Sequence, residues 1–223
     1  MRSFENREDT WVCDEPFYGY YLNESGATHP GYEEIIESMT CDQSKVIEVL
    51  TKGSKDPLTI NYQKHMTHHL LPEVTTDWLL GLKNCFLIRD PIRVISSYAR
   101  VRPDFSLEEL GMVQQRDLFE LCAQSGEIPP VIDASRCVED PEGTLRKLCA
   151  RLDISFSSKM LKWEAGPRIS DGVWSKYWYK ELNKTTRFSS RRISPRETET
   201  ANRYPQILKK SLQIYDQLAE YSL

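Results

Sequence analysis

The sequence predicts an α/β protein in which a central parallel sheet lies between two layers of helices. Short apolar runs typical of strands alternate along the chain with segments that carry apolar residues at helical spacing. This alternation favours right-handed crossovers between parallel strands. With 223 residues the chain is long enough for one sizeable core. We therefore expect a single domain over residues 1–223.

Four segments have the composition of strands: residues 10–16, 58–65, 84–89 and 130–134. The run 84–89 is almost continuously apolar, which is typical of a strand buried on both faces of a parallel sheet. In such sheets the ligand lies at the carboxyl ends of the strands. We therefore look for functional side chains where these four segments end.

The helix candidates are segments with apolar residues at helical spacing or with capping residues. They are residues 44–51 before Gly53, 72–82 after Pro72, 92–101, 106–124 with a capping box at Ser106, 140–152 with Asp140 as the cap, and 204–221 with Ile207, Leu208, Leu212, Tyr215 and Leu218 on one stripe. Residues 164–200, rich in Gly, Ser, Arg and aromatic residues, predict a long C-terminal loop region that can serve as a lid.

The composition is that of a globular protein without a strong overall charge. Hydrophobic residues make up 39% and charged residues 28% of the chain, and the formal net charge is −4. Such a chain has no global positive field with which to recruit nucleic acid, so we expect no nucleic-acid partner. Any site for an anion must be local.

The chain carries no sign of a membrane segment or a disulfide framework. No stretch approaches the ~20 apolar residues that a membrane-spanning helix needs, and the first residues are too charged for a secretory signal. The six cysteines are scattered without a C-x-x-C pair. We expect a cytoplasmic protein that does not bind membranes.

One candidate anion site follows the strand candidate 84–89. Arg89 ends this strand, Asp90-Pro91 turns the chain into a helix, and Ser97 follows Arg89 by eight residues. A guanidinium can bind a phosphate through paired N–H groups, and the serine hydroxyl can reach the same anion. The alternative, equally open on this chemistry, is an Arg89–Asp90 pair with Ser97 lining the helix.

Residues 86–100, FLIRDPIRVISSYAR, resemble the motif with which sulfotransferases bind the 3′-phosphate of 3′-phosphoadenosine-5′-phosphosulfate (PAPS). The resemblance implies that Arg89 and Ser97 are phosphate ligands, with Arg93 in support. Further segments resemble the bacterial-type branch of that family, namely residues 3–18, 130–135, 140–152 and 171–178. The resemblance also implies a fold of the P-loop nucleoside triphosphate hydrolase type.

In that family a first strand and a phosphate-binding loop precede the segment that resembles residues 2–7. This chain begins at Met1, inside the helix that should follow the loop. We therefore expect a sequence truncated at its N-terminus, without the first strand and the phosphate loop. The alternative is that another segment of the chain takes their place. Sulfuryl transfer is expected to depend on that missing part, because its backbone N–H groups bind the 5′-phosphosulfate.

Sulfuryl transfer needs a base for the acceptor's proton and positive charge near the bridging oxygen. Glu15 ends the strand candidate 10–16, and the following Pro16 favours an extended backbone at Glu15. The family commonly uses a glutamate as the base, so we predict this role for Glu15. The alternative is an exposed acid at the end of a strand or a helix cap.

Lys64 ends the next strand candidate, in a segment that loosely resembles the Lys-Thr-His segment of cytosolic sulfotransferases. We predict that Lys64 stabilises charge on the bridging oxygen. Met66 stands where the family has histidine, so His65 or His68 is the substitute. A metal site at His65, His68 and His69 is a weaker hypothesis, because no cysteine or carboxylate set accompanies them with zinc-ligand spacing. No metal is expected.

The loop region supplies two further candidates. Arg168 and Lys176 resemble, in composition only, the basic and glycine-containing loop that covers the nucleotide's 3′-phosphate in cytosolic sulfotransferases. Four aromatic residues of this region, which line an acceptor pocket or simply pack the loop, are Trp174, Tyr177, Trp178 and Tyr179. The arginines from Arg187 to Arg196 are typical of a solvated surface.

These observations predict a PAPS-dependent sulfotransferase that acts on a hydroxyl or amine of a small-molecule acceptor. The alternative is a non-catalytic relative that keeps nucleotide binding or serves as a partner protein. A kinase-like phosphotransferase is disfavoured, because the sequence lacks G-x-x-x-x-G-K-[ST].

Overall fold

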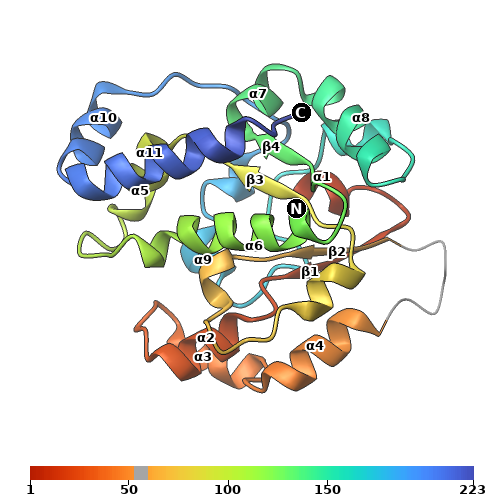
Figure 1. The fold of residues 1–223 in the computed structure, drawn as a ribbon, viewed down its shortest axis with the longest axis horizontal. Coiled ribbons are helices and arrows are strands. Elements are labelled where there is room, and N and C mark those ends of the chain that lie inside the picture. The colour runs from red at the N-terminus through yellow and green to blue at the C-terminus, as the bar shows by residue number, and fades with distance from the viewer. Residues whose placement is uncertain (53–59) are drawn as a thin grey trace. The chain divides into compact units, whose positions relative to one another are not determined.

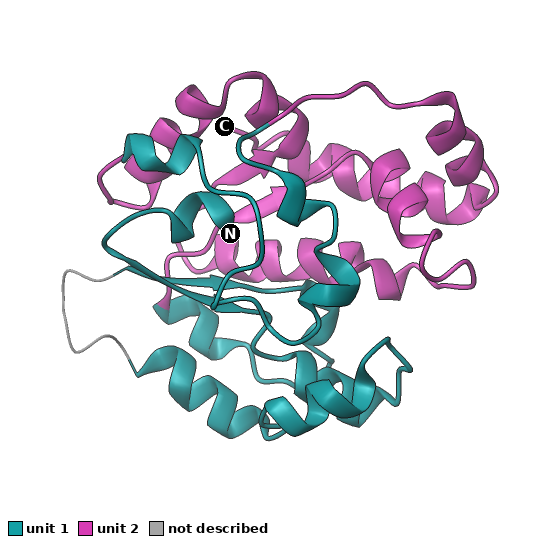
Figure 2. Ribbon diagram, turned by 180° about the vertical axis from the view of Figure 1, so that it is seen from behind, with its two compact units in different colours: residues 1–81, 157–188 teal, residues 82–156, 189–223 magenta. Residues whose placement is uncertain are grey.

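The computed structural model describes residues 1–52 and 60–223, and its chain divides into two compact units (Figure 2). Unit 1 contains residues 1–81 and 157–188, and unit 2 contains residues 82–156 and 189–223. Each unit is therefore built from two separate stretches of the chain. The expected helix stop at Gly53 and the first two residues of the strand candidate 58–65 lie outside the described residues.

Unit 1 combines a parallel pair of strands with short helices (Figure 1). Its elements are α1 (Arg2–Glu5), β1 (Thr10–Asp14), α2 (Tyr18–Ser25), α3 (Tyr32–Ser38), α4 (Gln43–Thr51), β2 (Ile60–Lys64), the 3₁₀ helices η1 (Thr67–His69), η2 (Asp77–Gly81) and η4 (Ser158–Leu161), α9 (Ser175–Trp178), and η5 (Leu182–Lys184).

Unit 2 has its own pair of parallel strands and the longer helices. Its elements are β3 (Phe86–Ile88), α5 (Pro91–Tyr98), the 3₁₀ helix η3 (Glu108–Leu110), α6 (Met112–Gln124), β4 (Val131–Asp133), α7 (Ala134–Glu139), α8 (Pro141–Arg151), α10 (Pro195–Asn202) and α11 (Pro205–Ala219).

In unit 1, β1 and β2 pair in parallel from Thr10 opposite Ile60 to Asp14 opposite Lys64. The ladder extends one step beyond β1, because the backbone N–H of Glu15 donates to the Lys64 carbonyl at 2.8 Å. Parallel strands bring their carboxyl ends to the same edge. The register therefore places the acidic end of β1 beside the lysine at the end of β2.

The core of unit 1 is rich in aromatic rings. The imidazole of His69 lies between two tyrosines, with ring centroids 4.5 Å from Tyr18 and 4.8 Å from Tyr21 in stacked geometry. Trp174, from the loop before α9, meets Tyr18 edge-on at 5.3 Å. Each large ring buries much apolar area, which helps such a small unit to form a core. The loop around α9 is thereby packed against α2.

A buried ion pair ties the N-terminal helix of unit 1 to the loop region. Two nitrogens of the Arg2 guanidinium donate to the Asp171 carboxylate at 2.6 and 2.7 Å, and one also reaches Asn183 Oδ1 at 2.9 Å. The two charged side chains are only 3% and 2% exposed. Removing one partner of such a pair typically costs about 3–5 kcal/mol, since the other charge stays buried and unpaired.

In unit 2, β3 and β4 pair in parallel from Phe86 opposite Val131 to Ile88 opposite Asp133. Their apolar side chains join residues of α6 and α11 in one buried cluster, which includes Phe119, Ile214 and Leu218. Such burial of apolar surface supplies the main favourable term in folding. The strand pair therefore lies in the core of this unit, as its apolar sequence predicts.

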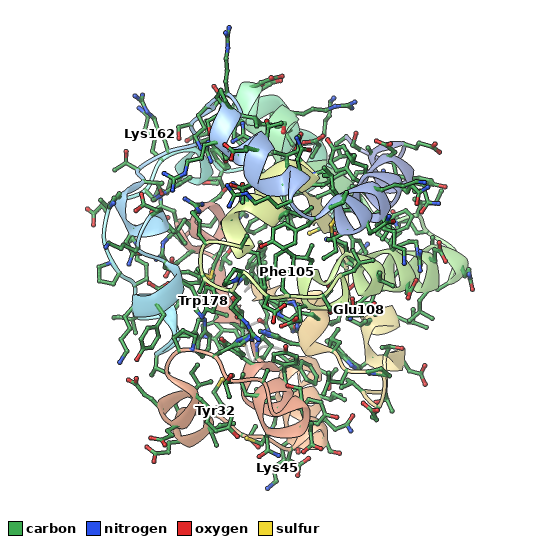
Figure 3. All side chains as sticks on the ribbon, turned by 90° about the vertical axis from the view of Figure 1, so that its left-hand side faces the viewer. Tyr32, Lys45, Phe105, Glu108, Lys162 and Trp178 are labelled. Carbon is green, nitrogen blue, oxygen red and sulfur yellow. The ribbon has the colours of Figure 1, made fainter. Side chains whose placement is uncertain are left out.

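The helix that follows β3 begins as the sequence predicts. The Asp90 carboxylate accepts a hydrogen bond from Ile92 N at 2.8 Å, and Pro91 occupies the first turn. Further along, Phe105, labelled in Figure 3, packs between Tyr98 and Tyr204 with ring centroids at 5.2 and 4.8 Å. These contacts fix α5 against the start of α11.

Two predicted helices were wrong in extent. Within 72–82 the structure has only η2, after a β-branched run at Val74, Thr75 and Thr76 that disfavours a helix. The segment 106–124 is interrupted at Gly111, whose φ of 71° separates η3 from α6. Only half of the expected capping box forms, since the Glu109 carboxylate accepts from Ser106 N at 2.8 Å.

Three details of burial and extent also differ from expectation. Leu87 in β3 is 60% exposed, so this strand is not buried on both faces in the structure. In α11 the buried apolar residues are Leu218, which belongs to the expected stripe, and Ile214, which does not, whereas Leu212 of that stripe is 39% exposed. The loop region contains α10, which we did not predict, although its Ser194–Glu197 capping box is visible in the sequence.

The described residues thus form a mixed α/β structure with helices and short parallel strands. The strands expected at 10–16 and 130–134 and the helix expected at 140–152 are confirmed. The three-layer sheet, the single domain and the lid function of residues 164–200 stay predictions. Within the residues described, no helix has the length and apolarity to cross a bilayer.

The buried histidines of unit 1 predict acid lability. Burial lowers the pKa of His68 to about 3, and desolvation of the partly buried His65 lowers its pKa to about 4. Below about pH 6.5 these histidines bind protons in the unfolded chain but not in the folded chain. The free energy of unfolding therefore falls as pH drops below that value, by up to ~1.4 kcal/mol per histidine and pH unit.

Thermal melts of the wild type and of His68→Gln at pH 7.5 and 5.5 would measure this effect. The wild type should lose more thermal stability between the two pH values than the variant, because glutamine does not titrate. An equal loss in both proteins would show that the lowered pKa of His68 is not a cause of the acid lability.

Candidate functional site

Glu15 lies directly after β1 in a strained backbone conformation. Its φ of 45° falls in the left-handed region, which is uncommon for a residue with a side chain. Hydrogen bonds on both sides hold it there, from Glu15 N to the Lys64 carbonyl and from Tyr18 N to the Glu15 carbonyl at 3.0 Å. The extended backbone expected from Pro16 was therefore wrong, because these two hydrogen bonds override the local preference.

The Glu15 side chain is buried, with 7% of the residue exposed, so the alternative of an exposed acid was also wrong. The Lys64 ammonium donates a hydrogen bond to Glu15 Oε1. The same ammonium lies 3.5 Å from Asp14 Oδ1. The parallel register of β1 and β2 thus brings the Lys64 ammonium next to the carboxylates of Asp14 and Glu15. Glu15 and Lys64 are two of the three residues that we predicted as catalytic.

Tyr179, which follows α9, completes this group. Its hydroxyl lies 2.8 and 3.0 Å from the two oxygens of the Asp14 carboxylate and 3.1 Å from Glu15 Oε1. Lys64 Nζ donates to the same hydroxyl at 3.0 Å. We call these four residues, Asp14, Glu15, Lys64 and Tyr179, the carboxylate quartet, after the two carboxylates that the lysine and the tyrosine contact. Sequence analysis had assigned Tyr179 only to an acceptor pocket or to packing.

The quartet has a defined protonation pattern. Burial raises the pKa of Glu15 most strongly, the neighbouring Asp14 raises it further, and Lys64 opposes both. Burial and the two carboxylates also raise the pKa of Tyr179 above its usual range. The phenol therefore keeps its proton and acts as a hydrogen-bond donor. Glu15 binds a proton more readily than an exposed glutamate does.

The histidines near the quartet are neutral at physiological pH. His69 Nδ1 lies 4.0 Å from Glu15 Oε2, and burial lowers the pKa of His69 well below its usual value. His65 Nε2 lies 3.2 Å from Gln63 Oε1. The imidazole ring of His65 faces Phe17 and Trp78. The structure thus brings His69, rather than His65, next to Glu15.

No group of three or more His, Cys, Asp or Glu side chains within residues 1–52 and 60–223 is arranged to hold a metal ion.

In unit 2, Arg89 follows the carboxyl end of β3. Within the described residues its guanidinium forms no hydrogen bond or ion pair, and Asp90 instead caps α5. The expected alternative of an Arg89–Asp90 pair is therefore not seen there. Partial burial lowers the pKa of Arg89, and the nearby charges of Arg93 and Arg191 lower it further.

Three basic or hydroxyl side chains of the α5 segment accompany Arg89. The Arg93 guanidinium donates to the Arg191 carbonyl, and Arg100 Nη2 donates to the Ser97 hydroxyl at 3.4 Å. Arg93 and Ser97 are four residues apart and so lie on one face of the helix. The excess of positive charge over negative charge at this face suits an anion.

Arg191 was assigned to a solvated surface in the sequence analysis, and the structure gives it a defined partner. Its guanidinium binds the Glu197 carboxylate at 2.6 and 2.7 Å. The signal for this pair was the capping box of α10, because the same Glu197 also accepts from Ser194 N at 2.9 Å. Recognising α10 in the sequence would have placed Arg191 three residues before its Ser194 cap.

Arg168 and Lys176, the two nucleotide ligands expected in the loop region, lie in unit 1, whereas Arg89, Arg93 and Ser97 lie in unit 2. Arg168 Nη2 donates to the Glu164 carbonyl at 3.0 Å. Lys176 forms an exposed ion pair with Glu34 at 2.5 Å.

The chain resembles known proteins over nearly its whole length. It is 37% identical over 221 residues to the branched-chain-amino-acid aminotransferase-like protein 1 of Arabidopsis thaliana, covering 99% of this chain and 39% of the relative. It is also 37% identical over 190 residues to the aminotransferase-like protein 2 of the same plant, covering 85% and 34%. The chain therefore spans less than two-fifths of the length of these relatives.

A solved structure shares the fold. The sulfotransferase domain from the curacin biosynthetic pathway superposes with a TM-score of 0.53 at 16% identity, over 92% of this chain and 78% of that one. The sulfotransferase domain family matches residues 1–219. The segments that carry the Arg89 motif and the carboxylate quartet both fall within this match, and the chain belongs to the sulfotransferase domain family.

Proposed function

We propose that this chain transfers a sulfuryl group from PAPS to a hydroxyl or amine of a small acceptor. The observation that carries the proposal is the buried Glu15, held in a strained conformation beside Lys64 at the end of a parallel strand pair. Strained backbone at such a position is typical of functional sites. Membership in the sulfotransferase domain family supports the type of reaction.

Glu15 is the proposed base. A catalytic base works best when its pKa lies near the operating pH, and burial moves that of Glu15 upward from the range of exposed carboxylates. The carboxylate takes the proton of the acceptor hydroxyl or amine as that atom attacks. The left-handed backbone at Glu15 directs the side chain towards Lys64 and Tyr179, which hold it for this step.

Lys64 is the proposed stabiliser of negative charge on the bridging oxygen. Its side chain is about a quarter exposed, at 24%, so the ammonium can face both the buried carboxylates and a bound ligand. A lysine has three N–H donors, which suffices for such a shared role. His65 is neutral at physiological pH, so we assign it no charge stabilisation, only the capacity to accept a proton.

The residues around Arg89 fit the 3′-phosphate of PAPS. Arg89 forms no ion pair in the described part of the chain, and the positive charges of Arg93 and Arg191 each act on it more strongly than the negative charge of Glu197. A phosphate would remove this repulsion and pair with the guanidinium. In the proposal Arg89 and Ser97 bind the 3′-phosphate, Arg93 supports them, and PAPS when bound supplies the sulfuryl group that is transferred.

Arg168 and Lys176 are proposed as further contacts to the nucleotide. The ion pair between Lys176 and Glu34 is exposed on both sides, and such pairs contribute only about 0–1 kcal/mol. Breaking the ion pair with Glu34 to bind a phosphate therefore costs Lys176 little free energy. Arg168 keeps one guanidinium nitrogen, Nε, buried without a partner among the residues described.

A non-catalytic nucleotide-binding protein is the second candidate. The carboxylate quartet is satisfied internally, as a purely structural group would be, and the arginines around Arg89 form a separate feature of unit 2. Nucleotide binding and sulfuryl transfer can therefore be tested apart.

Arg89→Ala should weaken the binding of 3′-phosphoadenosine-5′-phosphate at least tenfold in calorimetry. The loss of charge-assisted hydrogen bonds at ~1.5–3 kcal/mol each sets this magnitude. Arg116→Ala is the matched control, because Arg116 is an arginine of the same unit that pairs with Asp117 at the surface. Equal binding by wild type and Arg89→Ala would show that the phosphate site lies elsewhere.

Glu15→Gln should reduce sulfuryl transfer about 100-fold or more while nucleotide binding persists, since general base catalysis contributes about 10²–10⁴. Transfer is measured with radiolabelled PAPS and a phenol, an aliphatic alcohol and an amine as acceptors. Glu37→Gln, at an exposed position of α3, is the control. Nucleotide binding without transfer by the wild type would favour the non-catalytic candidate.

A further inference from the structure

The Tyr179 hydroxyl occupies a special place in the carboxylate quartet. It has one proton, yet it lies within hydrogen-bond distance of both the Asp14 and the Glu15 carboxylate. It also accepts a hydrogen bond from Lys64 at 3.0 Å, which uses one of its lone pairs. The proton therefore points to one carboxylate at a time and can turn to the other by rotation about the C–O bond.

We propose that Tyr179 is a positioning residue that supports Glu15 in both of its protonation states, by turning one hydroxyl proton between Glu15 and Asp14. This inference deepens the proposed function, on which it rests. Before the reaction Glu15 is a carboxylate that accepts hydrogen bonds from Lys64 and from the phenol. Asp14, at the neighbouring position of the chain, is then held by the more distant Lys64 ammonium.

The proton balance of the reaction explains why a rotating donor is needed. As the acceptor attacks, its O–H or N–H bond breaks and an O–H bond forms on Glu15, which becomes neutral and a donor. The neutral Glu15 can then donate to the Tyr179 oxygen, while the Tyr179 proton turns to Asp14 at 2.8 Å. Only hydrogens move in this exchange. Such preorganisation keeps the energy of reorganisation small.

Every element packed against Glu15 contributes to its charge environment. Asp14 of β1 repels a second negative charge, Lys64 of β2 attracts it, and His69 of η1 is neutral at 4.0 Å. Tyr179 donates from the segment after α9. Removing the phenol hydroxyl takes one hydrogen bond from each protonation state of Glu15. The bond to the charged carboxylate is the stronger of the two, so the charged state loses more. The pKa of Glu15, already raised by burial, should therefore rise further in Tyr179→Phe.

The Tyr179 ring is placed independently of its hydroxyl. Its backbone N–H donates to the Ser175 carbonyl at 2.7 Å, and its carbonyl accepts from Asn183 N at 2.8 Å. Asn183 in turn contacts the buried Arg2–Asp171 pair. The residue is 8% exposed and belongs to the aromatic core of unit 1. Phenylalanine can therefore replace the ring without losing this packing.

Infrared difference spectroscopy of the full chain tests the inference. The carbonyl band of a protonated carboxyl group is followed against pH, and Glu15→Gln identifies the band of Glu15. In Tyr179→Phe the midpoint of this titration should rise by about one to two pH units, the shift that follows from losing one hydrogen bond to a charged group. An unchanged or lower midpoint overturns the inference.

Two further proteins sharpen the test. Tyr215→Phe removes a tyrosine hydroxyl that donates to Asp133 at 2.5 Å in unit 2, so the Glu15 midpoint should stay unchanged. Replacing Tyr179 by difluorotyrosine keeps the shape of the side chain and makes the phenol a stronger donor. The midpoint should then fall, opposite to its change in Tyr179→Phe. A role in packing alone predicts no such opposite shifts and would be shown by their absence.

The titration needs neither donor nor acceptor, so it separates this inference from the proposed function. Where sulfuryl transfer is measured, the acid limb of kcat/KM should move in Tyr179→Phe by the same amount as the infrared midpoint. Transfer with an unmoved acid limb overturns the role of Tyr179. Shifted midpoints without transfer by any of the proteins overturn the proposed function alone.

Discussion

The parallel pairing of β1 with β2 is the constraint on which the candidate catalytic group depends. Its register sets Asp14 opposite Lys64, and one further backbone hydrogen bond fixes Glu15 beside the same lysine. A parallel pair brings residues distant in sequence to a common edge. The strain at Glu15 is tolerated because hydrogen bonds on both sides determine its backbone. The carboxylate pair is thus built by the sheet rather than by a loop.

Buried polar groups in unit 1 depend on one another, since none of them is stable there alone. Arg2 binds Asp171 and Asn183, and this places the chain that carries Tyr179. Tyr179 in turn donates to the carboxylates whose charge Lys64 offsets. Such networks contribute less to stability than to a unique arrangement, because each charge requires its partner. The rings of Tyr18 and Tyr21 stack on His69, and its burial keeps the imidazole neutral.

The arginines of unit 2 differ from the buried polar groups of unit 1, because not every one of them has a partner of opposite charge among the described residues. Arg191 pairs with Glu197. Arg89 forms no ion pair in the part of the chain that the structure describes, and the charges of Arg93 and Arg191 each act on it more strongly than that of Glu197. Leaving like charges together is unfavourable in the absence of an anion. A group of cations at the carboxyl end of β3 is therefore consistent with the anion site that we propose there. The capped start of α5 holds Arg93 and Ser97 at this position.

The sequence by itself determined the alternation of strands and helices, the turn into a helix at Asp90-Pro91, the cap at Asp140, and the family motif around Arg89, because these are local patterns of a few residues. It also indicated Glu15 and Lys64, each at the end of an apolar run. Tertiary structure alone decided that Tyr179 and His69 join Glu15, since these contacts link residues more than fifty positions apart. It also decided the backbone at Glu15, where hydrogen bonds to Lys64 and Tyr18 outweigh the preference that Pro16 imposes.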